Sequence, residues 1–234
     1  MQATIRTTRV RSARPDVRGF TLVELVVIIG ILAILMGLLL PSLSRSYGSA
    51  KNTRSLMTMQ QASLLVEQYT SQNQDVYPLA DYPTVGDCGL MWYKPLQAVG
   101  LIDGPETLDP AFTRENVHTN MLLSISVLAS ADLMKPGHTV PTKQVPPMAV
   151  HTYDVLHTSA KGILNQWKGN DGSVSSLWCC VPGAPRGPVA FADGSCGVYA
   201  WPELLGDRTA LYIENGVGSP VFATWQGWRG RDKP

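Results

Sequence analysis

The sequence has few charges and no strong excess of either sign. Only 16% of its 234 residues are charged, and the formal net charge is +1. Residues 1–19 hold five arginines and one aspartate, so residues 20–234 carry a formal charge of about −3. Binding to nucleic acid phosphates requires a basic face. We therefore predict no specific nucleic acid binding. For the basic cluster of Arg229, Arg231 and Lys233 we expect a frayed, solvated C-terminus, and binding of an acidic partner is the alternative.

Histidine is also scarce, and the common catalytic and metal-binding motifs are missing. His151 and His157 are six residues apart, whereas a helical zinc pair is four apart. No H-E-x-x-H, G-x-S-x-G, P-loop, G-x-G-x-x-G or C-x-x-C sequence is present. We predict no enzymatic activity and no metal ligands. Calcium stays possible with ligands unassigned, because no calcium-loop spacing links the candidate side chains, which are Asp171, Asp193, Asp207, Glu214, Asn215 and Asp232.

What the chain does have is one long apolar run near its N-terminus. Residues 18–41 read RGFTLVELVVIIGILAILMGLLLP, and no polar side chain occurs from Leu25 to Leu40. As a helix, residues 20–40 cover the roughly 30 Å hydrocarbon core of a bilayer. The basic flank before them predicts a cytoplasmic N-terminus. A secretory signal has a shorter apolar region and a small-residue cleavage site on its far side, where this chain has Pro41-Ser42, so a retained transmembrane segment is expected.

This segment resembles the N-terminal signal of the type IV pilin and type II secretion pseudopilin superfamily. The resemblance covers about 24 residues and consists of Gly19, Phe20, a lone Glu24 and a later proline, Pro41. It implies that a prepilin peptidase cuts after Gly19 and methylates the new N-terminal Phe20. A simple one-pass membrane anchor is the alternative interpretation.

Glu24 separates these two interpretations. A carboxylate in an apolar helix costs several kcal/mol and usually has a partner. The freed amine of Phe20 is the obvious partner, and the resemblance implies that Glu24 meets this amine on a neighbouring subunit during assembly. A wrong register would leave both charges buried and unpaired. The alternative is that Glu24 reaches the lipid headgroups from near the membrane edge.

The resemblance and the composition together predict three parts in the chain. Residues 1–19 are a cleaved basic leader, residues 20–75 a long helix whose residues 20–40 are the transmembrane and assembly segment, and residues 76–234 a globular head. Pro41 should kink the helix without ending it, because the helical pattern resumes at once. Fifteen of the seventeen prolines and all six tryptophans follow residue 75, which marks the change to a compact domain.

The head is predicted to be built around an antiparallel sheet. Asn120–Leu133 could form a helix or a strand, and its length favours a helix. Asp193-Gly194 is interpreted as a two-residue type I′ hairpin turn. The expected fold is therefore α+β, a long N-terminal helix on an antiparallel sheet, as in pilins. The strand-like runs are Met148–Val155, Leu177–Val181, Val189–Ala192, Cys196–Trp201, Thr209–Ile213 and Val221–Trp225.

The hairpin sequence carries a second resemblance. Phe191-Ala192-Asp193-Gly194-Ser195 is similar to the C-terminal hairpin of planctomycete pilin-like proteins, although Gly183 stands where that family has its motif histidine. Because that histidine is missing, we interpret Asp193-Gly194 as a structural turn.

Four cysteines lie in the part that would be exported, where disulfides persist. Adjacent Cys179 and Cys180 would face opposite ways on a strand, so they are expected to bond to different partners. One bond to Cys196 and one to Cys88 is the favoured arrangement. One disulfide, reduced core thiols or a zinc site are the alternatives.

Together these features predict a structural prepilin-like subunit of a type IV pilus or type II secretion pseudopilus. A competence filament and a minor-pilin role stay open. The resemblance implies these partners: other pilin-like subunits in a homo- or hetero-polymer, prepilin peptidase, the inner-membrane assembly platform, and the lipid bilayer before assembly. The expected location is the bacterial inner membrane, single-pass, followed by a periplasmic or cell-surface filament. The alternative is a membrane-tethered periplasmic binding or enzymatic domain that does not polymerise.

Overall fold

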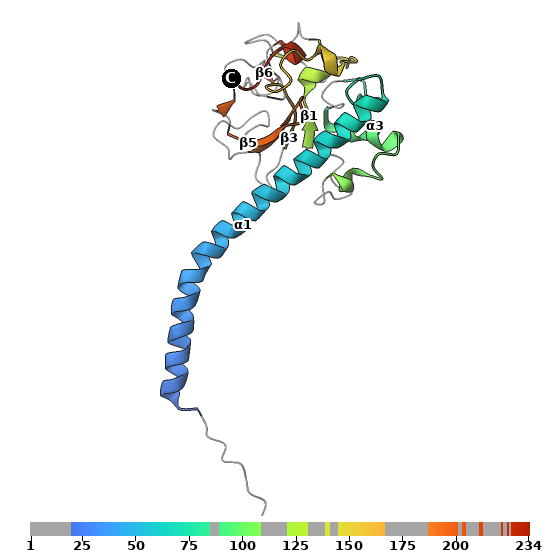
Figure 1. The fold of residues 1–234 in the computed structure, drawn as a ribbon. Helices are drawn as coiled ribbons and strands as arrows, with labels where there is room; N and C mark the ends of the chain where they lie inside the picture. Colours follow the sequence, from blue (N-terminus) through green and yellow to red (C-terminus); the bar gives the residue numbers. More distant parts are fainter. Residues whose placement is uncertain are drawn as a thin grey trace, which may run out of the picture. The chain divides into compact units, whose positions relative to one another are not determined.

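A single long helix, α1 (Leu22–Gln72), dominates the N-terminal part of the computed structural model (Figure 1). The chain divides into two compact units, Met1–Gly48 and Ser49–Pro234, and α1 contributes residues to both. The structure describes residues 20–84, 89–108, 121–130, 139–140, 145–166, 187–200, 203–204, 211–212, 221, 224 and 226–234. The predicted long N-terminal helix is confirmed, and Pro41 lies inside it.

From Leu25 to Leu40, α1 is apolar on all sides. Every side chain described between Phe20 and Gly48 is exposed, from Ile28 at 43% to Leu22 at 78% among the large apolar residues. A helix that is apolar all round belongs in a membrane or a protein core. The 51-residue α1 helix is long and apolar enough, by length and composition, to cross a membrane.

In the second unit, α1 becomes amphipathic. Met59, Ala62 and Val66 are at most 2% exposed, and their spacing of three and four residues places them on one face. They join one apolar core with residues of the sheet, such as Leu122 and Leu164. The Trp92 indole is buried in the same core and donates a hydrogen bond to the Met121 carbonyl at 3.0 Å.

The head contains a four-stranded antiparallel sheet with the strand order β1-β3-β4-β5. A short parallel pair, β2 with β6, lies in a separate sheet. The strands are β1 (Met121–Leu123), β2 (Thr139–Val140), β3 (Gly162–Gln166), β4 (Gly187–Phe191), β5 (Cys196–Tyr199) and β6 (Leu211–Tyr212). The short helices are α3 (Tyr93–Ala98) and the 3-10 helices η1 (Pro105–Thr107), η2 (Ile125–Val127), η4 (Thr152–Asp154) and η7 (Gly227–Arg229). The predicted α+β class is confirmed.

Two predicted elements of the head are wrong. In place of a helix, the described part of Asn120–Leu133 forms strand β1 and then η2. The reason is tertiary, because β1 pairs with β3 and the Ser126 side chain donates to the carbonyl of Val221 at 3.1 Å. Met148–Val155 is not a strand but a single bridge followed by η4. That 3-10 turn is stabilised by a capping box in which the Asp154 carboxylate accepts the His151 N–H at 2.9 Å.

The predicted hairpin is present, but its turn differs. Strands β4 and β5 fall within or beside the predicted runs. The Gly194 N–H donates to the Phe191 carbonyl at 3.0 Å, and the Phe191 N–H donates to the Ser195 carbonyl at 2.8 Å. This is a three-residue loop in which Gly194 alone has positive φ, at +82°, so the two-residue type I′ turn was wrong.

The remaining strand predictions have mixed outcomes. Leu177–Val181 lies outside the described residues, and Thr209–Ile213 is described only as β6. Val221–Trp225 is not a strand at its start, because Val221 lies in a turn at φ +70°. Strand β3 was not predicted. It begins at a bulge, where a side chain on Gly162 would collide with Val221, and it carries buried Asn165 and Gln166.

Candidate functional site

The described part of the chain begins at Phe20, inside the N-terminal signal. Gly19 lies outside the described residues, and Phe20 is 76% exposed and precedes α1. Thr21 and Glu24 form a reciprocal cap: the Glu24 N–H donates to Thr21 Oγ1 at 3.2 Å, and Glu24 Oε2 accepts the Thr21 N–H at 2.9 Å. Thr21 Oγ1 also donates to Glu24 Oε2 at 2.7 Å. This capping box satisfies backbone donors that the first helical turn leaves free.

The capping box gives Glu24 a local structural role that the sequence analysis had missed. The sequence Thr21-Leu22-Val23-Glu24 matches the T-x-x-E pattern just before an apolar run, so the signal was present. The box also holds the carboxylate against Thr21 at the start of the helix. The predicted pairing of Glu24 with the amine of Phe20 stays a prediction.

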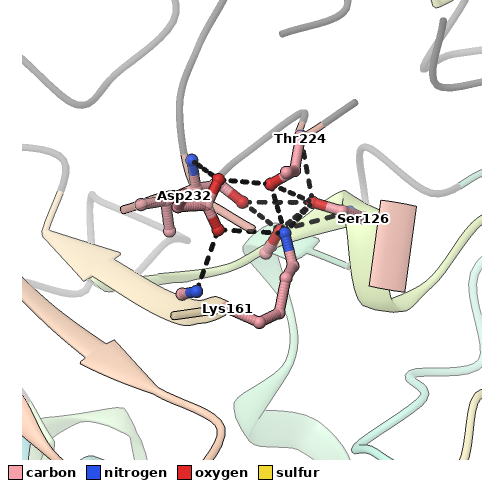
Figure 2. Close-up of polar contacts among 7 residues, drawn as sticks. Ser126, Lys161, Thr224 and Asp232 are labelled. Atoms are coloured by element: carbon pink, nitrogen blue, oxygen red, sulfur yellow. Dashed lines mark hydrogen bonds and ion pairs between the residues drawn. The ribbon is translucent and has the colours of Figure 1, made fainter. Parts of the chain in front are cut away.

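The one extensive polar cluster in the described interior surrounds Lys161. Its side chain is fully buried, and Figure 2 shows it directed at Ser126, Thr224 and Asp232. Lys161 Nζ donates to Ser126 Oγ and to Asp232 Oδ2, both at 3.1 Å, and to Thr224 Oγ1. Burial lowers the pKa of Lys161, and the opposing charge of Asp232 raises it. The ion pair with Asp232 therefore offsets part of the cost of burying the amine.

Asp232 holds together segments that are far apart in sequence. Its Oδ2 accepts the Gly162 N–H at 2.9 Å, and its Oδ1 accepts the Val221 N–H at 2.8 Å and the Thr224 hydroxyl at 2.5 Å. Asp232 is 1% exposed. The members of the cluster are almost completely buried, so the cluster is an internal polar network that joins distant segments of the head. Sequence reasoning missed it, because its members are separated by up to about a hundred residues.

The C-terminal residues are therefore ordered, and the expectation of a frayed basic end is wrong. Trp228 is 9% exposed, and the Asp232 N–H donates to the Ala160 carbonyl at 2.7 Å. Lys233 Nζ lies 4.1 Å from the centre of the Phe191 ring, a cation–π contact. Arg229 and Arg231 are exposed beside these anchored residues.

Hydrogen bonds within the loop explain the conformation of the β4–β5 hairpin turn. Asp193 Oδ1 accepts the Ser195 N–H at 3.0 Å and the Ser195 hydroxyl at 2.6 Å, which fixes the turn. Partial burial raises the pKa of Asp193, but the bonds from Ser195 and the charge of Lys233 outweigh this effect, so the pKa is lowered overall. Gly183 lies outside the described residues.

The cysteines are only partly described. Cys196 is half-buried on β5 and is the one cysteine among the described residues, and burial followed by the charge of Asp193 raises its pKa. Cys88, Cys179 and Cys180 lie outside the described residues, so the disulfide pairing stays a prediction.

The described residues contain no group of three or more His, Cys, Asp or Glu side chains placed to hold a metal ion. His151 stacks on Tyr153 with ring centres 4.7 Å apart and pairs with Asp154 at 3.4 Å. His118 and His138 lie outside the described part of the chain. The calcium candidates Asp171, Asp207, Glu214 and Asn215 also lie there, so calcium ligands stay unassigned.

Comparison with known families identifies the N-terminal segment. Residues 14–40 match the family model described as the prokaryotic N-terminal methylation motif. The chain thus carries the type IV pilin and pseudopilin signal, and with its long apolar helix it has the features of a single-pass, membrane-anchored prepilin-like precursor. None of the curated proteins and none of the solved structures matches the chain.

Proposed function

We propose that the chain is the precursor of a filament subunit, cut after Gly19, methylated on Phe20 and assembled into a type IV pilus or type II secretion pseudopilus. The observation that carries this proposal is the methylation motif at residues 14–40, continuous with a helix whose apolar side chains between Phe20 and Gly48 are all exposed. In water such a surface is unstable. A bilayer covers it before assembly, and neighbouring apolar stems cover it in a filament.

Glu24 sets the position of each subunit in this proposal. Cleavage after Gly19 creates an amine on Phe20, and the capping box keeps the Glu24 carboxylate at the same end of α1. A carboxylate and an amine from adjacent stems form an ion pair in apolar surroundings only at one axial register. Any other register leaves two unpaired charges, which costs several kcal/mol.

The basic leader and the apolar run together support a defined order of membrane insertion, processing and assembly. Five arginines before Gly19 favour a cytoplasmic leader, with the head on the opposite side of the inner membrane. A prepilin peptidase then acts at the membrane, and an assembly platform receives the processed subunit. The head, which buries its polar Lys161 cluster, supplies a stable outer surface and no chemistry of its own.

The decisive experiment is mass spectrometry of the N-terminal peptide from protein sheared off intact cells. The expected peptide starts at N-methylated Phe20. A Gly19→Val variant should retain the leader and be absent from the sheared fraction, whereas Ala13→Val, a matched change within the leader, should behave as wild type. An intact leader found only in the membrane fraction of wild-type cells would refute the proposal and favour a tethered periplasmic domain that does not polymerise.

A further inference from the structure

The ion pair between Lys161 and Asp232 places an amine against a carboxyl group inside the head. Lys161 Nζ lies 3.1 Å from Asp232 Oδ2, and the two side chains are 0% and 1% exposed. An amine and a carboxyl group can condense to an amide, and a fixed contact between them turns a bimolecular encounter into a unimolecular step. Bulk water opposes this condensation, and burial keeps bulk water away from the pair. The first requirement for a covalent bond between the two side chains is therefore met.

The Asp232 carboxyl group is held by more donors than the ion pair supplies. The Gly162 N–H donates to Oδ2 at 2.9 Å, and the Val221 N–H donates to Oδ1 at 2.8 Å. Backbone donors fixed on a carboxyl group polarise it and stabilise the negative charge that an attacking amine places on oxygen. They also keep the group from turning away from Lys161. This arrangement suits a tetrahedral intermediate as well as a carboxylate.

The Thr224 hydroxyl connects the two groups of the pair. Thr224 Oγ1 accepts a hydrogen bond from Lys161 Nζ, and it donates to Asp232 Oδ1 at 2.5 Å (Figure 2). A hydroxyl that accepts from one group and donates to the other can carry a proton from the nitrogen to the oxygen. Ser126 Oγ accepts a second hydrogen bond from Nζ, at 3.1 Å, and so orients the amine.

Burial also favours the form of the amine that reacts. Desolvation lowers the pKa of Lys161, and this effect exceeds the opposing charge and hydrogen bond of Asp232. In surroundings of low polarity, moving one proton from the ammonium to the carboxylate removes two buried charges. The neutral amine then has a free electron pair, and the carboxylic acid has a hydroxyl group that can leave as water.

We propose that Lys161 and Asp232 become joined by an intramolecular amide bond after the head has folded. The electron pair of Nζ attacks Cγ of Asp232 and forms a C–N bond, while the Gly162 N–H holds Oδ2. Oδ1, which carries the first transferred proton, receives a second one from the nitrogen through the Thr224 hydroxyl. The C–Oδ1 bond then breaks, and Oδ1 leaves as water.

This reaction balances without any other reactant, because the ammonium and carboxylate of the ion pair together give one amide and one water molecule. The ion pair is the form that a newly folded head contains. The step is internal to the head, acts on no substrate and is independent of leader cleavage. The bond would join positions 71 residues apart and fix the C-terminal segment to the residue before β3.

The test is peptide mapping by mass spectrometry of the full-length protein, purified in detergent and digested with trypsin under denaturing conditions. Amide formation removes the positive charge that trypsin recognises at Lys161. The expected product is residues 144–168, uncut at position 161, joined to residues 232–234 and lighter than the two separate peptides by one water molecule. Lys161→Arg keeps the positive charge but has no nucleophilic amine, so it should give no linked product.

Two substitutions at Thr224 test the transfer of the proton. Thr224→Ser keeps the hydroxyl and should give the linked peptide, whereas Thr224→Val should lower the linked fraction at least about tenfold in protein purified soon after synthesis. Thr158→Val changes an exposed threonine outside the cluster and should match the wild type. A native tryptophan fluorescence spectrum shows that each variant is folded.

The wild-type digest decides the proposal by itself. If it contains only peptides cut after Lys161 and no linked product, the amide bond does not form and Lys161 and Asp232 are a plain ion pair. A linked fraction in Thr224→Val equal to that of the wild type would overturn the role of the hydroxyl. A linked product in the wild type that is lost in Lys161→Arg and in Thr224→Val would support both parts.

Discussion

Replacing Asp232 with asparagine tests whether the buried cluster around Lys161 stabilises the head. Asparagine keeps the size of the side chain and one acceptor oxygen, so the bonds from Val221 N–H and Thr224 can persist. The other oxygen becomes an NH₂ group. It faces the Lys161 ammonium and the Gly162 N–H, which at present donate to Asp232 Oδ2 at 3.1 and 2.9 Å.

The expected loss in the free energy of unfolding can be estimated from the bonds that Asp232→Asn removes. A buried donor without an acceptor costs about 1–3 kcal/mol, and more when it is charged. Removing one partner of a buried ion pair costs about 3–5 kcal/mol, because the remaining charge is uncompensated. Both charges here are almost completely buried, at 0% and 1% exposure. Since domains are stable by only about 5–15 kcal/mol, Asp232→Asn should remove a large part of the total.

The assay is urea unfolding of the full-length protein in detergent micelles, followed by tryptophan fluorescence. The reporters include the buried Trp92 and Trp228. The same substitution at the exposed Asp103 is the control and should change the free energy of unfolding by less than about 0.5 kcal/mol. If Asp232→Asn lowers it by less than about 1 kcal/mol, the ion pair contributes little and the argument is wrong.

Three further substitutions test the stem, the turn and the core. Glu24→Ala should leave processing intact but reduce the subunit in sheared filaments by about tenfold or more, since 1.4 kcal/mol suffices for that factor; equal amounts on immunoblots would contradict the pairing role. Gly194→Ala should cost about 1–2 kcal/mol in urea unfolding through its φ of +82° alone, because a Cβ there meets no atom within 4 Å. Trp92→Phe removes the indole hydrogen bond to the Met121 carbonyl and should cost about 1–3 kcal/mol by the same measurement, and an unchanged midpoint would show that this bond contributes little.

The stem could be predicted from the sequence because its information is local. The apolar run, the preceding arginines and the residues around the cleavage position all lie between Arg6 and Pro41, and none depends on the rest of the fold. The sequence also predicts that α1 continues through Pro41, because the pattern of apolar residues resumes after the proline. The information for the capping box is local too, because its T-x-x-E pattern spans only Thr21 to Glu24.

The head was harder because tertiary contacts decide its elements. Residues 121–127 became strand and 3-10 helix through pairing with β3 and the bonds of Ser126 to Val221. Strand β3 has no alternating pattern, since all five of its residues are buried. Lys161 comes directly before β3, and from the sequence alone a lysine at this place is expected to be exposed to solvent. Its partner, Asp232, is 71 residues away, so spacing in the sequence could not reveal the pair.

The wide sequence separation of Lys161 and Asp232 also orders the folding of the head in time. The hairpin around Gly194 closes over three residues, a microsecond event, whereas the ion pair must close a loop of 71 residues at a larger entropic cost. We therefore expect the hairpin to form early and the ion pair late. Until it closes, Lys161 remains hydrated and the segment around Asp232 stays unattached. We expect a protease present during folding to cut this late segment first, and a completed head to resist it.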